Sequence, residues 1–207
     1  MQAHADTLGT ARVVRRHEYS AMPWRNGGGT TFEIACEPRG AAQFEWRLSL
    51  ALIEQGGPFS NFAGYIRAIS LVSGAGCILR GIEAIPVRLD AAGVTKRFPG
   101  AASVTCELIA GPCCDLNLMV REPGAIVSAQ SLRLSDVAQS LTAQRENAVF
   151  CLEGTIECVG NGGERFTLAK HDTFIVAAAA AGDWRIRAGG PGGRGRGGGD
   201  ASARGRA

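Results

Sequence analysis

The side chains best suited to chemistry lie at alternating positions within apolar segments. In "FEWRLSLAL", Arg47 and Ser49 share one face, since successive side chains of an extended chain point to opposite sides. In "CDLNLM", the same alternation places Asp115 and Asn117 together. A guanidinium binds a carboxylate through two parallel hydrogen bonds, and amide or carboxylate oxygens accept hydrogen bonds from a ligand. These types and spacings indicate a site for a small polar ligand.

Arg67, in "YIRAISL", shares its face with apolar side chains, so a charge is predicted where apolar groups gather. A buried charge needs a partner, and Asp115 or Glu33 can supply one. One interpretation is therefore a buried structural ion pair. The other makes Arg67 or Arg47 a fork for the carboxylate of a ligand. The sequence leaves both open.

The loop "MPWRNGGGTT" is the second candidate region. Its candidate binding residues are Trp24, Arg25, Asn26, Gly27 and Gly28. Consecutive backbone N–H groups of such a loop can form an anion-binding concavity, and an indole can wall a pocket. The alternative is a tight turn that uses the positive φ open to glycine. The loop lacks the lysine of a P-loop, so nucleotide binding is not expected.

The loop "GGPFSNFAG" contributes three further candidates, Phe59, Ser60 and Phe62. The two aromatic rings can close the mouth of a pocket. They can equally cap the end of a barrel.

Metal and thiol chemistry are not indicated. The three histidines, His4, His17 and His171, are scattered and form no H-x-H pair, and none of the seven cysteines forms a C-x-x-C pair. We expect no bound metal, no cofactor and no catalytic cysteine, with the cysteines acting as small buried hydrophobes. His171, in "AKHDTF", is predicted to be a turn residue rather than a base.

The elements that must position these residues are β-strands. Period-two patterns and short apolar runs separated by Gly, Pro, Asn or Asp predict strands in "ARVVRR", "FEIACE", "FEWRLSLAL", "YIRAISLV", "CILR", "IPVRL", "SVTCELI", "CDLNLMV", "AVFCLEG", "TIECVG", "RFTLAK" and "DTFIVAAA". Little helix is expected. A weak repeat joins "ISLVSGAGCIL", around Gly74, to "VFCLEGTIECV", around Gly154, and favours two small barrels in one chain.

Composition narrows the class of partner. The 207 residues are 45% hydrophobic and 20% charged, as in globular proteins, and no apolar run reaches the roughly 20 residues of a membrane helix. The N-terminus lacks the apolar region of a secretory signal, so a cytoplasmic location without membrane contact is expected. The net charge of +3 is carried by a Gly/Arg-rich tail. The rest of the chain is therefore neutral, and nucleic-acid binding is not expected.

Four stretches together resemble the HutD/Ves family. They are "MPWRNGGGTTFEI", "FEWRLSLALIEQGGPFSNFAGYIRAISLVSG", "FPG" and "GPCCDLNLMVRE", in that order and between Val13 and Glu122. The resemblance implies an all-β bicupin, two RmlC-like jelly-roll barrels in one chain. We place the first barrel in residues 1–122 and the second in 123–188, with strands free to be exchanged between them, and a disordered tail in 189–207.

Two positions depart from the family pattern. Phe32 follows "GGGTT", where a basic or polar residue is common, and Ala101 follows "FPG", where an acidic residue is common. We expect the first to affect a ligand contact and the second to affect a turn.

The expected function is that of a sensor or regulatory binder of a small polar or anionic metabolite, which the resemblance links to histidine utilisation. The alternative is a metal-free cupin enzyme, an isomerase or lyase of a small carboxylic acid, with Glu33, Asp115 or His171 as its base. A group that titrates near neutral pH inside the first barrel would favour the enzyme. The oligomeric state is left open, with a homodimer as one option.

Overall fold

The computed structural model describes residues 11–123, 128–143, 146–177 and 182–190. Nearly all regular structure there is β-strand, and the described residues form a single helix, the 3-10 turn η1 (Arg16–Glu18). The all-β prediction is thus confirmed. The tail expected over 189–207 lies almost wholly outside the described residues.

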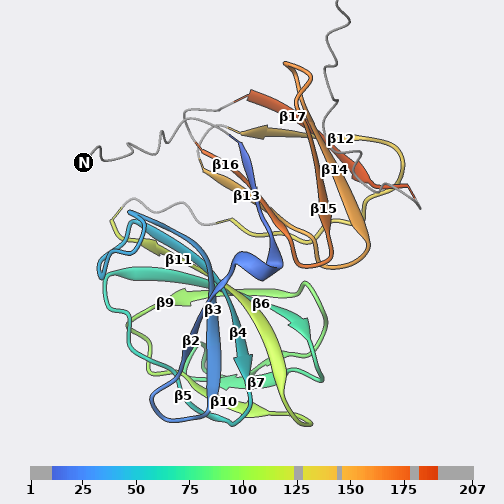
Figure 1. Cartoon of the computed structure of the whole chain (residues 1–207). Coiled ribbons are helices and arrows are strands. Elements are labelled where there is room, and N and C mark those ends of the chain that lie inside the picture. Colours follow the sequence, from blue (N-terminus) through green and yellow to red (C-terminus); the bar gives the residue numbers. More distant parts are fainter. Residues whose placement is uncertain (1–10, 124–127, 144–145, 178–181, 191–207) are drawn as a thin grey trace, which may run out of the picture.

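The first barrel consists of two antiparallel sheets that face each other (Figure 1). The larger has the order β2-β3-β4-β11-β6-β9 and comprises β2 (Ser20–Pro23), β3 (Gly29–Glu37), β4 (Trp46–Ile53), β11 (Cys113–Arg121), β6 (Tyr65–Ser73) and β9 (Thr95–Pro99). The smaller has the order β5-β10-β7-β8 and comprises β5 (Gly57–Pro58), β10 (Thr105–Leu108), β7 (Cys77–Arg80) and β8 (Val87–Leu89).

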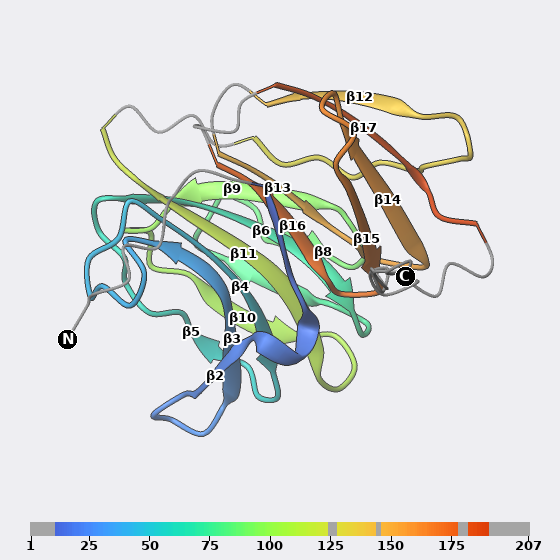
Figure 2. The ribbon, with the colours of Figure 1, turned by 45° about the horizontal axis from the view of Figure 1, so that its top comes forward.

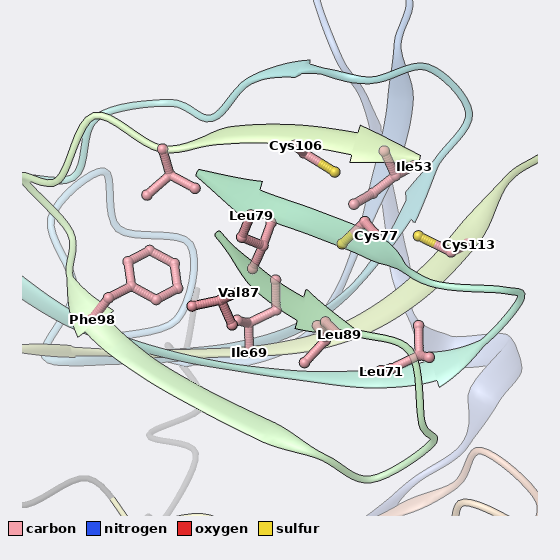
Figure 3. Close-up of a cluster of buried hydrophobic side chains, with 11 residues drawn as sticks. Ile53, Ile69, Leu71, Cys77, Leu79, Val87, Leu89, Phe98, Cys106 and Cys113 are labelled. Carbon is pink, nitrogen blue, oxygen red and sulfur yellow. The ribbon is translucent and has the colours of Figure 1, made fainter. Parts of the chain in front are cut away.

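A buried apolar cluster fills the space between these two sheets at one end of the barrel. Its members are Ile53, Ile69, Leu71, Cys77, Leu79, Val87, Leu89, Phe98, Val104, Cys106 and Cys113. Figure 3 shows side chains of the two sheets pointing toward one another across this core. Three cysteines are among them, as small buried hydrophobes, and the seven cysteines are all free thiols.

The second barrel also has two antiparallel sheets. One has the order β1-β16-β13, with β1 (Arg12–Val14), β16 (Thr173–Val176) and β13 (Asn147–Phe150). The other has the order β12-β17-β14-β15, with β12 (Gln139–Ala143), β17 (Gly182–Ala188), β14 (Thr155–Gly160) and β15 (Arg165–Ala169). Between them the rings of Phe166, Phe174 and Trp184 pack at centroid distances of 4.9–5.9 Å. This interior is apolar and closely filled.

One strand crosses from one half of the chain to the other. β1 lies near the N-terminus, yet it pairs with β16, with Val13 opposite Phe174 (Figure 2). The first barrel therefore begins at β2 rather than at the start of the chain, and the second barrel contains a strand from each end of the sequence.

The two barrels pack through the outer face of the six-stranded sheet. Leu48 and Leu50 of β4 join Val72 of β6 in one buried cluster with Val14 and Ile175 of the second barrel. The apolar face of "FEWRLSLAL" is thus the contact between barrels. Its polar face points into the first barrel, which determines where the candidate site lies.

The predicted strands are largely present, with informative differences. "ARVVRR" is a strand only to Val14, after which the chain turns into η1. β2, β5, β9, β12 and β17 were not predicted. In β17, "GDWRIRA", Trp184 and Ile186 alternate with arginines. This period-two pattern was sufficient to predict the strand.

The weak repeat corresponds to a shared structural role. Gly74, at φ +89°, follows β6, and Gly154, at φ +71°, lies between β13 and β14. In each barrel the two flanking strands belong to different sheets. Each glycine therefore lies where the chain passes from one sheet of its barrel to the other.

Candidate functional site

Strand register brings the predicted polar residues of three strands together inside the first barrel. Across β4, β11 and β6, Arg47 lies opposite Met119, which lies opposite Arg67. The next inward row contains Ser49 and Asn117. One row further along β11 lies Asp115, opposite Ala51 and Leu71. Glu33 of β3 extends the second row as the partner of Ser49. These residues form what we call the interior polar cluster.

The cluster is buried and its charges are not paired. Arg67 is 5% exposed, Asp115 2% and Asn117 6%. Yet the ion pairs found among the described residues include none within 4.0 Å that joins Arg67 to Asp115, to Glu33 or to any other carboxylate. The structural ion pair, one of the two interpretations of Arg67, is not formed.

Four atoms of the cluster are buried without a hydrogen-bond partner. They are Nε of Arg47, Nε of Arg67, Oδ1 of Asp115 and Oδ1 of Asn117. Each buried polar atom without a partner lowers the free energy of unfolding by about 1–3 kcal/mol, and by more when it is charged. Four such atoms in one cluster are therefore unusual in a folded protein. Two are donors and two are acceptors. The cluster is therefore complementary to a molecule that carries both an anionic group and a hydrogen-bond donor.

Aromatic rings, rather than carboxylates, surround the two guanidinium groups. The Cζ atom of Arg67 lies 5.1 Å from the ring centroids of Phe59 and Phe98 and 5.7 Å from that of Phe62. That of Arg47 lies 5.3 Å from the same Phe62 ring. Phe62 is thus within cation–π distance of both arginines. The backbone N–H of Phe62 donates to the Gly100 carbonyl at 2.9 Å, which anchors the loop that carries this ring.

Burial changes the acidity of these groups. Desolvation raises the pKa of Asp115 to about 7, and the positive charge of Arg67 only partly opposes this. Desolvation likewise lowers the pKa of Arg67 to about 10, with Asp115 opposing and Arg47 adding to the effect. The pKa of Arg47 is lowered mainly by burial. For Asp115, Arg67 and Arg47, neighbouring charges therefore do not offset the cost of burial.

Cys36 is a member of this region that the sequence did not reveal. A bulge between Glu33 and Ala35 shifts the alternation of β3, so Cys36 lies opposite Arg47. Its thiol donates to Oε1 of Glu33 at 3.4 Å. Met119 accepts a weak hydrogen bond from Nη2 of Arg47 at 3.7 Å. Sulfur atoms therefore flank the arginine and the carboxylate at this end of the cluster.

The loop "MPWRNGGGTT", which we call the glycine loop, lies at the end of the six-stranded sheet opposite to Arg47 and Arg67. Gly29 is opposite Ile53, which is opposite Cys113, whereas Arg47 and Arg67 flank Met119. Six residues of an extended strand span roughly 20 Å. The structure therefore separates Trp24, Arg25, Asn26, Gly27 and Gly28 from the two arginines. The member of the interior polar cluster nearest to this end of the sheet is Asp115, two residues from Cys113.

The loop has the contacts of a tight turn. The Gly27 N–H donates to the Trp24 carbonyl at 3.0 Å, and the Gly28 N–H donates to Oδ1 of Asn26 at 3.0 Å. Gly27 has a φ of +70°. A Cβ on Gly29 would overlap the carbonyl oxygen of Leu52, so the close approach is to the neighbouring strand. These contacts favour the turn interpretation, because the amides needed for an anion site already have acceptors.

We expect Gly27→Ala to lower the free energy of unfolding by about 1 kcal/mol, because a Cβ is disfavoured at this φ although nothing lies within 4 Å of it. Chemical denaturation measures the change. Gly27→Asn is the matched control and should lose less, since asparagine tolerates positive φ. Affinity for any ligand of the interior polar cluster should not change; a tenfold loss without loss of stability would restore the loop as a binding element.

The remaining candidate residues are placed as follows. Ser60 is exposed in the β5–β6 loop, between the two phenylalanines that contact Arg67. His171 has a φ of +67° in the β15–β16 turn of the second barrel, far in sequence from the cluster. Phe32 lies on the outer face of its sheet, in the contact between barrels, and not inside the first barrel. Its expected effect on a ligand contact stays a prediction. Ala101 lies in a turn after β9.

No group of three or more metal-binding side chains is found in the described part of the chain. Nor does any helix there have the length and apolarity needed to cross a membrane.

The sequence of this chain is similar to a known family and to several of its relatives. The family described as HutD matches residues 16–192. The chain belongs to the HutD family. An uncharacterized 21.2 kDa protein in the hutC 3' region of Pseudomonas putida is 40% identical over 109 residues, which are 52% of this chain and 57% of that protein. The match thus spans a little over half of that relative. Protein Ves of Citrobacter koseri is 34% identical over 137 residues, covering 63% of this chain and 67% of Ves.

Several solved structures share the fold of this chain. A conserved protein of unknown function from Pseudomonas aeruginosa PAO1 is 33% identical, with a TM-score of 0.78 over 86% of this chain and 92% of its own. HutD from Pseudomonas fluorescens SBW25 is 30% identical, with a TM-score of 0.62 over 86% of this chain and 94% of its own. Bacillus subtilis oxalate decarboxylase, at 8% identity and a TM-score of 0.60 over 88% of this chain and 74% of its own, shares the fold alone. This HutD-family chain is a bicupin.

Proposed function

We propose that this HutD-family protein binds a small carboxylate metabolite in the interior polar cluster and acts as a sensor or regulatory binder. The observation that supports this most directly is Arg67, which is 5% exposed and has no carboxylate partner among the described residues. A buried cation without a partner is unfavourable unless another anion, such as a ligand, compensates it.

The pattern of unpartnered atoms narrows the chemistry of the ligand. The Nε atoms of Arg47 and Arg67 require acceptors, which a carboxylate supplies. Oδ1 of Asn117 and Oδ1 of Asp115 require donors, such as an N–H or O–H group. Amido and hydroxy acids satisfy both requirements. A simple aliphatic acid satisfies only the first.

The family relatives suggest where to look for the ligand. One lies in a hutC 3' region and another is named HutD, so we propose a link to histidine utilisation in the cytoplasm. N-acyl and N-formimidoyl amino acids from histidine breakdown carry both a carboxylate and an N–H donor. Nucleic acid and membranes are not proposed as partners.

Titration calorimetry with matched ligands tests this function. We expect saturable binding of an N-acyl amino acid, weaker binding of a dicarboxylate of the same length, and no binding of the corresponding acyl amide that lacks a carboxylate. The loss of one arginine–carboxylate contact, worth about 1.5–3 kcal/mol, corresponds to roughly ten- to hundredfold in affinity. Equal affinity for the acid and its uncharged amide would contradict the proposed role of the arginines.

A second candidate function is supported by one observation. Burial raises the pKa of Asp115 to about 7, which suits a general base or acid at neutral pH. The chain would then be a metal-free enzyme acting on a small carboxylic acid, with Asp115 moving a proton. Incubation of the same compounds in D₂O distinguishes the two: exchange of a ligand C–H proton or formation of a product supports the enzyme, and unchanged ligand supports the binder.

A further inference from the structure

A second group of residues with unused binding capacity lies at the junction of the barrels, where η1 connects β1 to β2 (Figure 1). The Arg16 backbone N–H donates to Oδ1 of Asp172 at 2.9 Å. Asp172 is 5% exposed and also accepts hydrogen bonds from Arg15, at 2.8 Å, and from the Ala169 N–H, at 3.0 Å. The backbone of Arg16 is thus fixed against the β15–β16 turn.

The side chain of Arg16 is held by aromatic rings alone. Its Cζ atom lies 4.5 Å from the ring centroid of Phe32 and 5.2 Å from that of Tyr19. Among the described residues, the Arg16 guanidinium has no hydrogen-bond acceptor and no ion-pair partner. Neighbouring cations differ, because Arg15 pairs with Asp172 and Lys170 pairs with Glu153. The five donors of Arg16 are therefore available and already positioned.

His171 lies beside Tyr19, on whose ring this guanidinium lies, and has an unusual backbone conformation. It is a non-glycine residue at φ +67°, held by a hydrogen bond from its N–H to the Cys151 carbonyl at 2.7 Å. Its carbonyl accepts from the hydroxyl of Tyr19 at 2.5 Å, which places it beside the ring on which Arg16 lies. Its imidazole stacks on Phe150 with centroids 5.6 Å apart. Such fixed outliers are concentrated at functional positions.

Two cations act on the His171 imidazole. Burial, followed by the positive charges of Lys170 and Arg16, lowers the pKa of His171, and only Glu153 opposes this. Glu153 is exposed and paired with Lys170. An anion placed between Arg16 and His171 would relieve this repulsion.

We propose that Arg16 and His171 form an anion site at the junction of the barrels, distinct from the interior polar cluster, which binds a small oxyanion such as a carboxylate or a phosphate. The guanidinium supplies two parallel donors and the imidazole N–H a third. The rings of Phe32 and Tyr19 lie against the guanidinium and that of Phe150 lies against the imidazole, so both donors are held on apolar surfaces. Phe32, unusual at its position in the sequence, acts here as the platform of the arginine.

NMR of the histidine side chains in the full chain tests this site. Inorganic phosphate and, separately, acetate are added at constant pH and ionic strength, with the His171 signal assigned through His171→Asn. We expect a saturable shift of the His171 imidazole signal and no shift of exposed His17. Arg16→Gln should weaken the binding at least tenfold. The phosphate and acetate series show which oxyanion is preferred.

Arg12→Gln is the matched control, because it removes the same charge from an exposed position at the start of β1. It should leave the affinity unchanged. Equal loss in both variants would overturn the site and indicate general electrostatic attraction, as would an absent or non-saturable shift in the wild-type protein. Arg67→Met should not affect the His171 shift, which separates this site from the proposed function of the first barrel.

Discussion

Replacing Arg67 with methionine is expected to raise the free energy of unfolding of the ligand-free protein by about 1–3 kcal/mol at pH 7. The reason is that Arg67 is a buried cation without a carboxylate partner, and an apolar side chain of similar length removes its desolvation cost. The same substitution should weaken ligand binding roughly ten- to hundredfold, because a guanidinium–carboxylate contact is lost. Chemical denaturation and titration calorimetry measure the two effects.

The opposite signs of these two effects distinguish a binding residue from a structural one. Arg121→Met is a suitable control, because Arg121 pairs with Glu45 at 3.0 Å and lies over the ring of Tyr65, 5.5 Å from its centroid. This control should leave affinity unchanged and give no gain in stability. A loss of several kcal/mol in Arg67→Met, together with no binding by the wild-type protein, would show that Arg67 serves the fold alone.

Replacing Asp115 with asparagine should remove a pH dependence of stability between about pH 4 and 7. The pKa of Asp115 is near 3.9 in the unfolded chain and is raised to about 7 in the folded protein. Between these values the folded state binds more protons, so the wild-type protein loses stability as pH rises. The loss is about 1.4 kcal/mol per pH unit, or on the order of 4 kcal/mol in all.

Asp115→Asn has no carboxyl group to ionise, so it should match the wild-type protein near pH 4 and exceed it in stability at pH 8 by up to about 4 kcal/mol. Urea denaturation across this range gives the difference curve. Glu153→Gln, which removes an exposed carboxylate, should keep the wild-type slope. If Asp115→Asn also keeps that slope, Asp115 is ionised at neutral pH in the folded state, and its proposed role as a proton-transfer group is lost.

Sequence reasoning found the strands of the site because alternation is a local property. It placed Arg47 with Ser49, and Asp115 with Asn117, on common faces. It did not determine that these faces meet, because this requires the strand order β4-β11-β6, which is set by pairing between distant parts of the chain. The resemblance to a family supplied the barrel that makes such convergence expected.

Alternation in β4 also does not show which of its two faces points into the first barrel. Alternation of Leu48 and Leu50 with Arg47 and Ser49 is ordinarily typical of a strand with an apolar core face and a solvated face. In this structure the leucines contact the second barrel and the polar residues line the inside of the first. The presence of a second domain on the outer face decides this. It is a long-range fact that no short window contains.

Neither the bulge in β3 nor the role of the glycine loop could be predicted from the local sequence. The bulge in β3 shifts register by one residue and so brings Cys36 inward, although simple alternation from Glu33 would point it outward. The glycine loop was ambiguous because a turn and an anion site require the same residues. Only its hydrogen bonds, which already use the amides of Gly27 and Gly28, favour the turn.

The pairing of β1 with β16 makes the two halves of this chain inseparable as folding units. A fragment that starts after the first barrel would lack β1 and leave the backbone N–H and C=O groups along one side of β16 unpaired. The first barrel alone would carry β1 with nothing to pair against. We therefore expect cooperative unfolding of both barrels in one transition. Neither half of the chain can therefore be separated from the other without leaving a strand of the second barrel unpaired.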